Sequence, residues 1–259
     1  MRKAVILFKT LLTLEKRVTK TPSKITYYTF QIFKLLLCGF LSFLIIEEEV
    51  KSLEDLNVII DVYLFLILFL TFIERLVKYV SKTEISLEKI NHLPIGKKEI
   101  YFSFLLADLL SFRNLAYFFM LGIIFRFLIV NYGFYAIFSI FFLFAFYISI
   151  LIWIRDLIII LDNFFSKRKI KNALGAILGI LASSFIILSF IGERMDLESN
   201  PQKIIAVFSY LPFGWAGNGI ISLISQSIGQ GLIYLLLLLS FALAGVKIGV
   251  VLVKKKKFG

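Results

Sequence analysis

Long apolar runs, interrupted by short charged segments, recur along the whole chain. A helix needs about 20 mostly apolar residues to cross the roughly 30 Å hydrocarbon core of a bilayer. The runs have this length and show no strand-like alternation. They predict six membrane-spanning helices, at residues 25–46, 56–73, within 101–130, 134–161, 173–192 and 232–253.

The composition agrees with a membrane location. Hydrophobic residues make up 59% of the 259 residues, Phe alone occurs 29 times, and the mean hydropathy is +0.91. A soluble core of this length does not need so much apolar material. We therefore expect an all-α integral membrane protein, in which Asn131 and Gly133 form a tight turn between the third and fourth spans.

Basic residues fall in every second connection between the predicted spans. They lie at residues 2–24, 75–98, 167–171 and 254–257, whereas the intervening connections are acidic, very short or mixed. Lys and Arg in short loops stay on the cytoplasmic side. Both termini, including the basic tail 254–259, are therefore expected in the cytoplasm, with residues 25–253 as a transmembrane domain in the cell membrane. The net charge of +12 then reflects topology and not nucleic-acid binding.

Residues 1–24 precede the first predicted span and predict an amphipathic helix. Leu7, Leu11, Leu14 and Val18 recur at helical spacing, and the opposite face is basic. Such a helix lies on the membrane surface, where it contacts lipid headgroups. It serves either as an anchor to anionic lipids or as a brace for a partner protein, and the sequence leaves both open.

The cytoplasmic connection at residues 74–100 predicts a short helix. Ser81 and Glu84 have the spacing of a capping box, which starts a helix. Pro94 disfavours helical geometry at Leu93, so the helix is expected to end near residue 91. Its apolar contact residues would be Ile85, Leu87 and Ile90. The alternative is an ordinary solvated loop.

Two short motifs resemble segments of the membrane subunits of ABC-2 type exporters. Residues 93–99, Leu-Pro-Ile-Gly-Lys-Lys-Glu, are similar to the motif that opens the third span in that family. Residues 211–216, Leu-Pro-Phe-Gly-Trp-Ala, are similar to the family's Leu-Pro-x-Gly-Trp segment on the outer side, before the last span. Together with six spans and cytoplasmic termini, the resemblance covers essentially the whole chain.

The resemblance implies a permease subunit that works with separate cytoplasmic ABC ATPase subunits, which bind the ATP and Mg. The helix at residues 81–91 would be the coupling helix that docks in a groove of the ATPase. The residues that the resemblance assigns to ATPase coupling are Ser81, Glu84, Ile85, Leu87, Ile90, Leu93, Pro94 and Gly96. A second permease chain, identical or different, would complete the pathway.

The resemblance also concerns the outer segment, residues 193–230. Residues 211–228 would form short helices that dip into the outer leaflet. The motif residues there are Leu211, Pro212, Gly214 and Trp215. Asn218 and Gly219 depart from the family pattern, which favours small apolar residues at these positions.

The chain itself offers little for catalysis. It has no G-x-x-x-x-G-K-[ST] phosphate loop. His92 is its only histidine and Cys38 its only cysteine, which excludes the usual metal clusters and Cys/His pairs. We therefore expect neither enzyme activity nor a cofactor in the chain, and energy would come from the partner.

Ionisable residues within predicted spans are functional candidates, because placing a charge in a membrane is costly. Arg126, Arg155 and Lys247 lie close to span ends and are expected to snorkel to the interface. Asp61 likewise lies near the outer end of the second span. The candidates for a substrate path are the residues that are harder to place at an interface: Lys34, Asp108 and Arg113.

The start of the third span decides how deep two of these residues lie. A single helix from residue 101 to 128 is about eight residues longer than a span needs. We favour a surface helix up to Phe112, followed by a span from Leu115, which would put Asp108 and Arg113 at the interface.

Two other classes of membrane protein fit the sequence less well. An ion-coupled secondary transporter would use Lys34, Asp61, Asp108 and Arg113 as its coupling site. A polytopic membrane enzyme lacks a residue set that could perform the chemistry.

Overall fold

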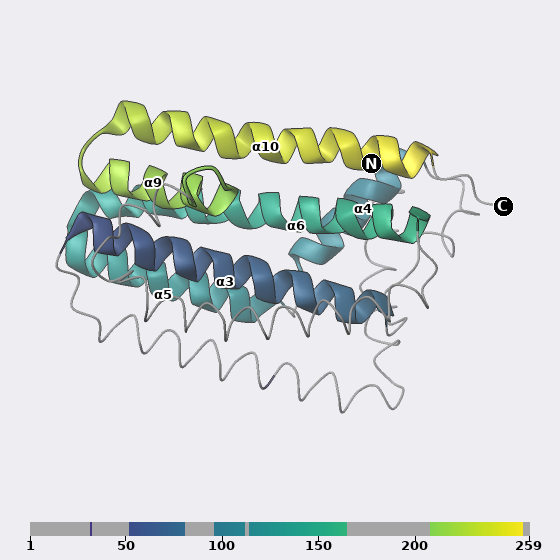
Figure 1. Cartoon of the computed structure of the whole chain (residues 1–259), viewed down its shortest axis with the longest axis horizontal. Helices are drawn as coiled ribbons and strands as arrows, with labels where there is room; N and C mark the ends of the chain where they lie inside the picture. Colours follow the sequence, from purple (N-terminus) through teal and green to yellow (C-terminus); the bar gives the residue numbers. More distant parts are fainter. Residues whose placement is uncertain (1–31, 33–51, 81–95, 112–113, 165–207, 256–259) are drawn as a thin grey trace, which may run out of the picture.

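A computed structural model describes residues 32, 52–80, 96–111, 114–164 and 208–255 of the chain (Figure 1). The regular elements within these ranges are all helical. They are α3 (Leu53–Val80), α4 (Lys97–Leu109), α5 (Leu115–Tyr132), the 3-10 helix η3 (Gly133–Phe138), α6 (Ser139–Phe164), α9 (Pro212–Ile224) and α10 (Ile228–Lys255).

Three stretches of the described residues are long and apolar enough to cross a membrane. They are Leu53–Leu76, Ala116–Leu161 and Ile228–Val253. The predicted spans 56–73, 134–161 and 232–253 fall within them, so the described residues agree with an all-α membrane protein. The predicted spans 25–46 and 173–192, the surface helix 1–24 and the coupling helix 81–91 lie outside the described residues.

The middle stretch folds back on itself at the predicted turn. α5 ends at Tyr132, and the next residue, Gly133, has a φ of +70°, which a residue with a Cβ rarely adopts. Asn131 donates a hydrogen bond from Nδ2 to the carbonyl of Phe127 at 2.8 Å. α6 begins at Ser139, five residues later than the predicted span, because residues 133–138 form η3.

Residues 97–132 are divided into two helices, α4 and α5, as expected. α4 has 13 residues, so at 1.5 Å per residue it is about 20 Å long and too short to cross a bilayer. Nδ2 of Asn114 donates to the carbonyls of Asp108 and Leu109. This side chain therefore satisfies carbonyl groups that the end of α4 leaves without helical partners.

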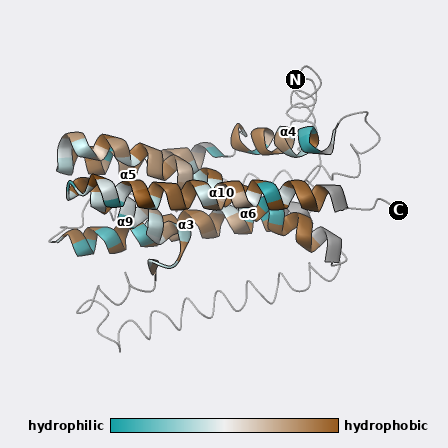
Figure 2. Cartoon of the chain, turned by 90° about the horizontal axis from the view of Figure 1, so that it is seen from above, coloured by the Kyte–Doolittle hydropathy of each residue, from teal (hydrophilic) through white to brown (hydrophobic). Residues whose placement is uncertain are grey.

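The long helices lie alongside one another (Figure 1). α3, α6 and α10 all end at the same end of the bundle, where α4 also lies, and we call this the α4 end. α9, η3 and the first turns of α3 and α10 lie at the opposite end, the α9 end. Figure 2 shows that the long helices are predominantly hydrophobic along their lengths.

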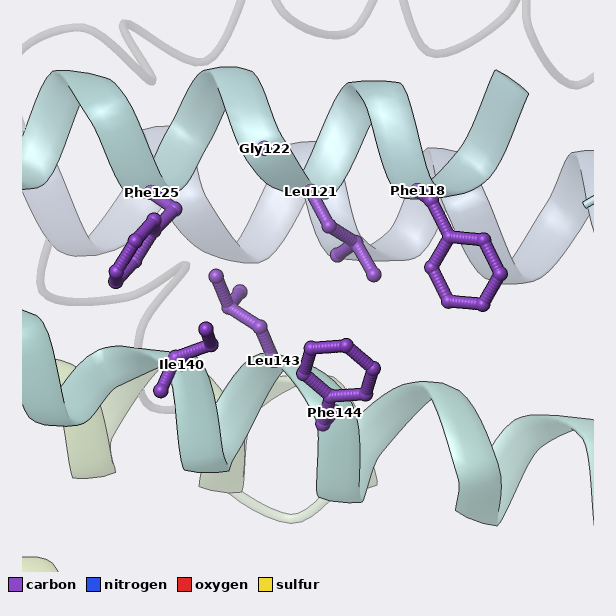
Figure 3. A pocket seen from close by; sticks show the side chains of 7 residues that line it. All are labelled: Phe118, Leu121, Gly122, Phe125, Ile140, Leu143 and Phe144. Atoms are coloured by element: carbon purple, nitrogen blue, oxygen red, sulfur yellow. The ribbon is translucent and has the colours of Figure 1, made fainter. Parts of the chain in front are cut away.

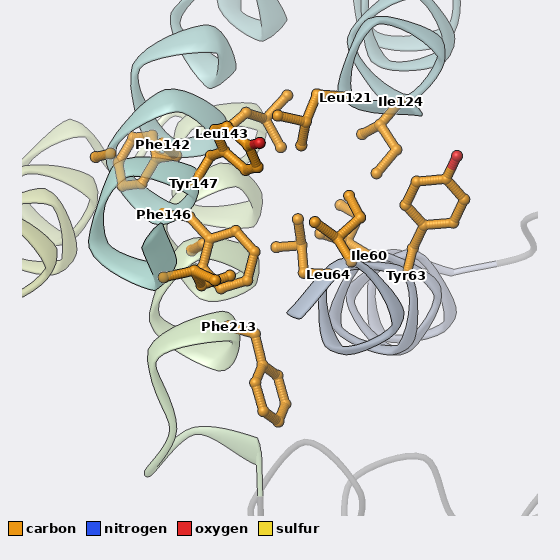
Figure 4. Close-up of a cluster of buried hydrophobic side chains, with 14 of the residues drawn as sticks. Ile60, Tyr63, Leu64, Leu121, Ile124, Phe142, Leu143, Phe146, Tyr147 and Phe213 are labelled. Atoms are coloured by element: carbon orange, nitrogen blue, oxygen red, sulfur yellow. The ribbon is translucent and has the colours of Figure 1, made fainter. Parts of the chain in front are cut away.

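One core joins α3, α5, η3, α6, α9 and α10. Its buried side chains include Leu64, Ile124, Phe146 and Phe213 (Figure 4). α10 packs on α6 through two glycines four residues apart, Gly245 and Gly249. A Cβ at Gly245 would lie 2.6 Å from Cγ2 of Ile152. Small residues at this spacing allow two helices to approach closely.

Candidate functional site

Charged side chains from three helices meet at the α4 end of the bundle. Asp108 of α4 lies between Arg75 of α3 and Arg155 of α6. Nη1 of Arg75 is 2.6 Å from Oδ1 of Asp108, and Nη1 of Arg155 pairs with Oδ2 of the same carboxylate. The three side chains are only 7%, 13% and 9% exposed, in the order Arg75, Asp108, Arg155. We call these three residues the charge triad.

The surroundings of the charge triad offset part of the cost of burying ions. Removing charges from water is costly, and the attraction between them offsets that cost only when the geometry is good and further contacts are made. The guanidinium of Arg155 lies over the ring of Phe104, 4.6 Å from its centroid, which is a cation–π contact. Because Phe104 and Asp108 both belong to α4, this helix is held to Arg155 twice.

Two tyrosines bind the acidic neighbours of the triad arginines. The hydroxyl of Tyr101, on α4, donates to Oδ1 of Asp156 at 2.9 Å, and that of Tyr117, on α5, donates to Oε2 of Glu74 at 2.9 Å. Burial, and next the negative charge of Asp156, raise the pKa of Tyr101 above its usual range. The Tyr101 hydroxyl therefore remains a hydrogen-bond donor at physiological pH.

α10 closes over the Tyr101–Asp156 pair. A Cβ on Gly249 would collide with Oδ1 of Asp156 and with the ring of Tyr101. At this position the close approach of α10 requires a residue without a side chain.

We therefore expect Gly249→Ala to lower the free energy of unfolding by about 1–3 kcal/mol, the usual cost of overpacking. The matched control is Gly229→Ala in the same helix, where a Cβ would have nothing within 4 Å. Thermal unfolding of the full-length chain in detergent measures both. Equal midpoints for the two variants would show that α10 does not approach Asp156 as described.

The structure brings only part of the predicted substrate path into view. Asp108 lies in the charge triad, while Lys34 and Arg113 lie outside the described residues. Arg155 was expected to snorkel, and this prediction was wrong, because Asp108 and Phe104 hold its side chain inside the bundle. Arg126 and Lys247 are exposed, and their snorkelling stays a prediction.

Asp61 lies in the third turn of α3, and its expected position near the outer end of the second span stays a prediction. Its side chain is fully buried beneath α9. Since the charge triad includes Arg75 of the same helix, 14 positions further along, Asp61 and the triad are separated by about 20 Å of helix.

Most of the predicted coupling residues lie outside the described residues. They are Ser81, Glu84, Ile85, Leu87, Ile90, Leu93 and Pro94. Gly96 is the N-cap of α4, and its N–H donates to Oε2 of Glu99 at 3.4 Å. The motif at residues 93–99 therefore runs directly into the helix that carries Asp108.

The second motif opens α9. Leu211 is the N-cap and Pro212 is the first helical residue, where a missing N–H is not needed. Gly214 packs directly against the backbone carbonyl of Phe208. Trp215 contacts Phe241 of α10 edge-on, with ring centroids 5.7 Å apart. Where short helices were expected, the structure has one helix of 13 residues, a turn and the start of α10.

An apolar pocket lies between α5 and α6 (Figure 3). Its volume is about 350 Å³, and its lining comes from both helices. The lining residues are Phe118, Leu121, Gly122, Phe125, Ile140, Leu143 and Phe144. Such a lining suits hydrocarbon and offers no side chain that could orient a hydrophilic molecule.

Sequence reasoning missed most of the charged contacts at the α4 end. A signal was nevertheless present, because Glu74-Arg75 and Arg155-Asp156 are adjacent pairs of opposite charge near the ends of apolar runs. In the structure, each pair directs its arginine to Asp108 and its carboxylate to a tyrosine. This arrangement of charged pairs can hold α4 against α3 and α6.

Among the described residues no group of three or more His, Cys, Asp or Glu could hold a metal.

Comparison of the chain with models of protein families, with curated proteins and with solved structures finds no match.

Proposed function

We propose that this chain is the permease subunit of an ABC-2 type exporter. It forms a translocation pathway with a second permease chain, and separate cytoplasmic ATPase subunits drive it. In this proposal the chain crosses the cell membrane six times and has both termini in the cytoplasm. The support comes from the two sequence motifs, from the helical bundle and from the way α4 is attached to that bundle.

The observation that carries the proposal is the position of the charge triad. The motif at residues 93–99 leads from the proposed coupling loop into α4, and α4 is held through Asp108 to Arg75 of α3 and Arg155 of α6. A displacement of the loop would therefore reach two long helices through buried ionic contacts. Such a contiguous connection is what a coupling element needs in order to pass motion to a membrane bundle.

The direction of the helices supports the proposed orientation. α3, α6 and α10 end at the α4 end (Figure 1). In the sequence, each is followed or ended by basic residues, at 75–98, 167–171 and 254–257. Helices that share an end of the bundle and are followed in the sequence by basic residues are what the positive-inside rule predicts for a cytoplasmic face.

The proposed topology predicts which positions an impermeant thiol reagent reaches in intact cells. Cysteines placed at Ser52 and Ser199 should react from outside, and one at Ser166 should react only after the membrane is permeabilised. Each is introduced into a chain in which Cys38 is replaced by Ser, so that the label reports a single site. Labelling of position 166 in sealed cells would contradict six spans with cytoplasmic termini.

The coupling function predicts a partner at the loop. A photo-crosslinking residue at position 87, in the native membrane, should capture a cytosolic protein that carries a phosphate-loop sequence. The same residue at position 52, on the proposed outer side, should capture no such protein. Capture at both positions, or at neither, would argue against a docking site in this loop. A crosslinked dimer of permease chains is expected in the same membranes.

The ion-coupled alternative needs its acidic residues in one site. Asp61 lies about 20 Å along α3 from Arg75, which binds Asp108. Asp108 is paired with Arg75 and with Arg155. The described members of that predicted coupling site therefore do not come together.

A further inference from the structure

A second buried polar group lies at the α9 end of the bundle. Asp61 of α3 is 0% exposed, and neither of its carboxylate oxygens has a hydrogen-bond partner in the described part of the chain. Asn57, one helical turn earlier, is 4% exposed, and its Oδ1 also has no partner there. Three buried acceptor oxygens thus lack a donor.

α9 brings these oxygens together. Gly217 of α9 lies directly over them: a Cβ at this position would be 2.8 Å from Oδ1 of Asn57 and closer still to Oδ1 of Asp61. Nδ2 of Asn57 donates to Oδ1 of Asn218 at 2.7 Å, which directs the Asn57 oxygen away from Asn218. Both unsatisfied Oδ1 atoms therefore lie beside the same glycine, between α3 and α9.

Within the described residues, no charged side chain forms a hydrogen bond or an ion pair with Asp61. α9 has no ionisable residue. On α6 and α10, the ionisable residues closest to the α9 end are Tyr147 and Tyr234, and neither forms a hydrogen bond with Asp61. η3 contributes only the exposed Tyr135, and Glu54 of α3 lies in the exposed first turn.

A buried carboxylate without a partner is so unfavourable that it takes up a proton or binds a cation. The close approach of Gly217 leaves little space beside Oδ1 of Asp61, whereas a metal ion needs several oxygen ligands arranged around it. A proton needs no additional space. It also turns one carboxylate oxygen into the donor that Oδ1 of Asn57 lacks.

We propose that Asp61, Asn57 and Gly217 form a proton-binding site between α3 and α9, in which the protonated carboxyl of Asp61 donates to Oδ1 of Asn57. Loss of this proton would leave an unpaired negative charge under α9 and weaken the packing of that short helix. The site is independent of the proposed exporter function, because it rests only on contacts among the described residues.

Infrared difference spectroscopy of the full-length chain in lipid nanodiscs tests this site. A protonated carboxyl has a C=O stretching band that is separate from carboxylate bands and shifts in D₂O. The spectrum of the wild type minus that of Asp61→Asn at neutral pH should contain one such band. The matched control, Glu54→Gln, removes an exposed carboxyl of the same helix and should remove only carboxylate bands.

A further variant, Asn57→Leu, keeps the test decisive if Asp61→Asn folds poorly. In Asn57→Leu the protonated-carboxyl band should persist but shift, because its hydrogen-bond acceptor is gone. Loss of a carboxylate band in Asp61→Asn would overturn the proposal, since Asp61 would then be ionised and Asn57 would present its amide nitrogen to it. A sodium-dependent rise of the unfolding midpoint in the wild type but not in Asp61→Asn would equally overturn it in favour of a cation site.

Discussion

Asp108→Asn is expected to lower the free energy of unfolding by about 3–5 kcal/mol, the usual cost of removing one partner of a buried ion pair. The substitution keeps the shape of the side chain and removes its charge. Arg75 and Arg155, both largely buried, would then face each other without the carboxylate that lies between them. Thermal and denaturant unfolding of the full-length chain in detergent measures the loss.

A compensating variant distinguishes the loss of charge from the loss of shape. Replacing the whole charge triad by apolar residues, as Arg75→Met, Asp108→Leu and Arg155→Met, removes all three ions together. Buried ionic groups replaced in this way often leave stability unchanged or increased. We therefore expect the triple variant to be more stable than Asp108→Asn. Wild-type stability of Asp108→Asn itself would show that Asp108 does not lie between two buried arginines.

If the proposed function is right, Leu87→Asp should release the proposed ATPase subunit while leaving the membrane bundle folded. A coupling helix docks through apolar contacts, and moving a charge into such a groove costs several kcal/mol. A loss of about 4 kcal/mol corresponds to roughly a thousandfold weaker binding. The amount of ATPase that co-purifies with the tagged chain, and the hydrolysis rate of the purified complex, measure the effect.

Ser86→Asp is the matched control, because it adds the same charge at the neighbouring position, outside the set Ile85, Leu87 and Ile90. It should leave co-purification close to that of the wild type. If both variants retain the ATPase and insert normally, the loop at residues 81–99 is not the coupling element.

The helices themselves could be predicted because their signals are local. A run of about 20 apolar residues predicts a span whatever surrounds it. Gly133 marks the end of α5, since it takes up a backbone conformation that other residues avoid. The break before Leu115 could be predicted from length, because residues 101–128 exceed what one span needs. In the structure, Asn114 binds the last carbonyl groups of α4.

The charged contacts could not be predicted because they depend on how helices are rotated and paired. Distance from a span end suggested that Arg155 would reach the interface, but α4 places Asp108 and Phe104 beside it. Asp61 lies only two to three turns from the start of α3 and would be near water if that helix stood alone. It is buried because α9 packs over it with Gly217, and the sequence of α3 contains no trace of that contact.

The motif at residues 211–216 shows the same division. Leu211 and Pro212 lie at the start of α9, and Pro suits the first helical position whatever the helix packs against. That α9 covers a buried carboxylate depends on residues about 160 positions away, as the hydrogen bond from Asn57 to Asn218 shows. The presence of Asn218 in α9 is thus explained by its contact with α3.

The most direct test of the proposed function is to purify the tagged full-length chain from its native membrane and to measure ATP hydrolysis in the purified material. The account predicts that a separate subunit with a phosphate-loop sequence co-purifies in a stable ratio with the chain, and that hydrolysis is lost when the lysine of that phosphate loop is replaced. A folded, correctly inserted chain that purifies without any ATP-hydrolysing partner would contradict the account.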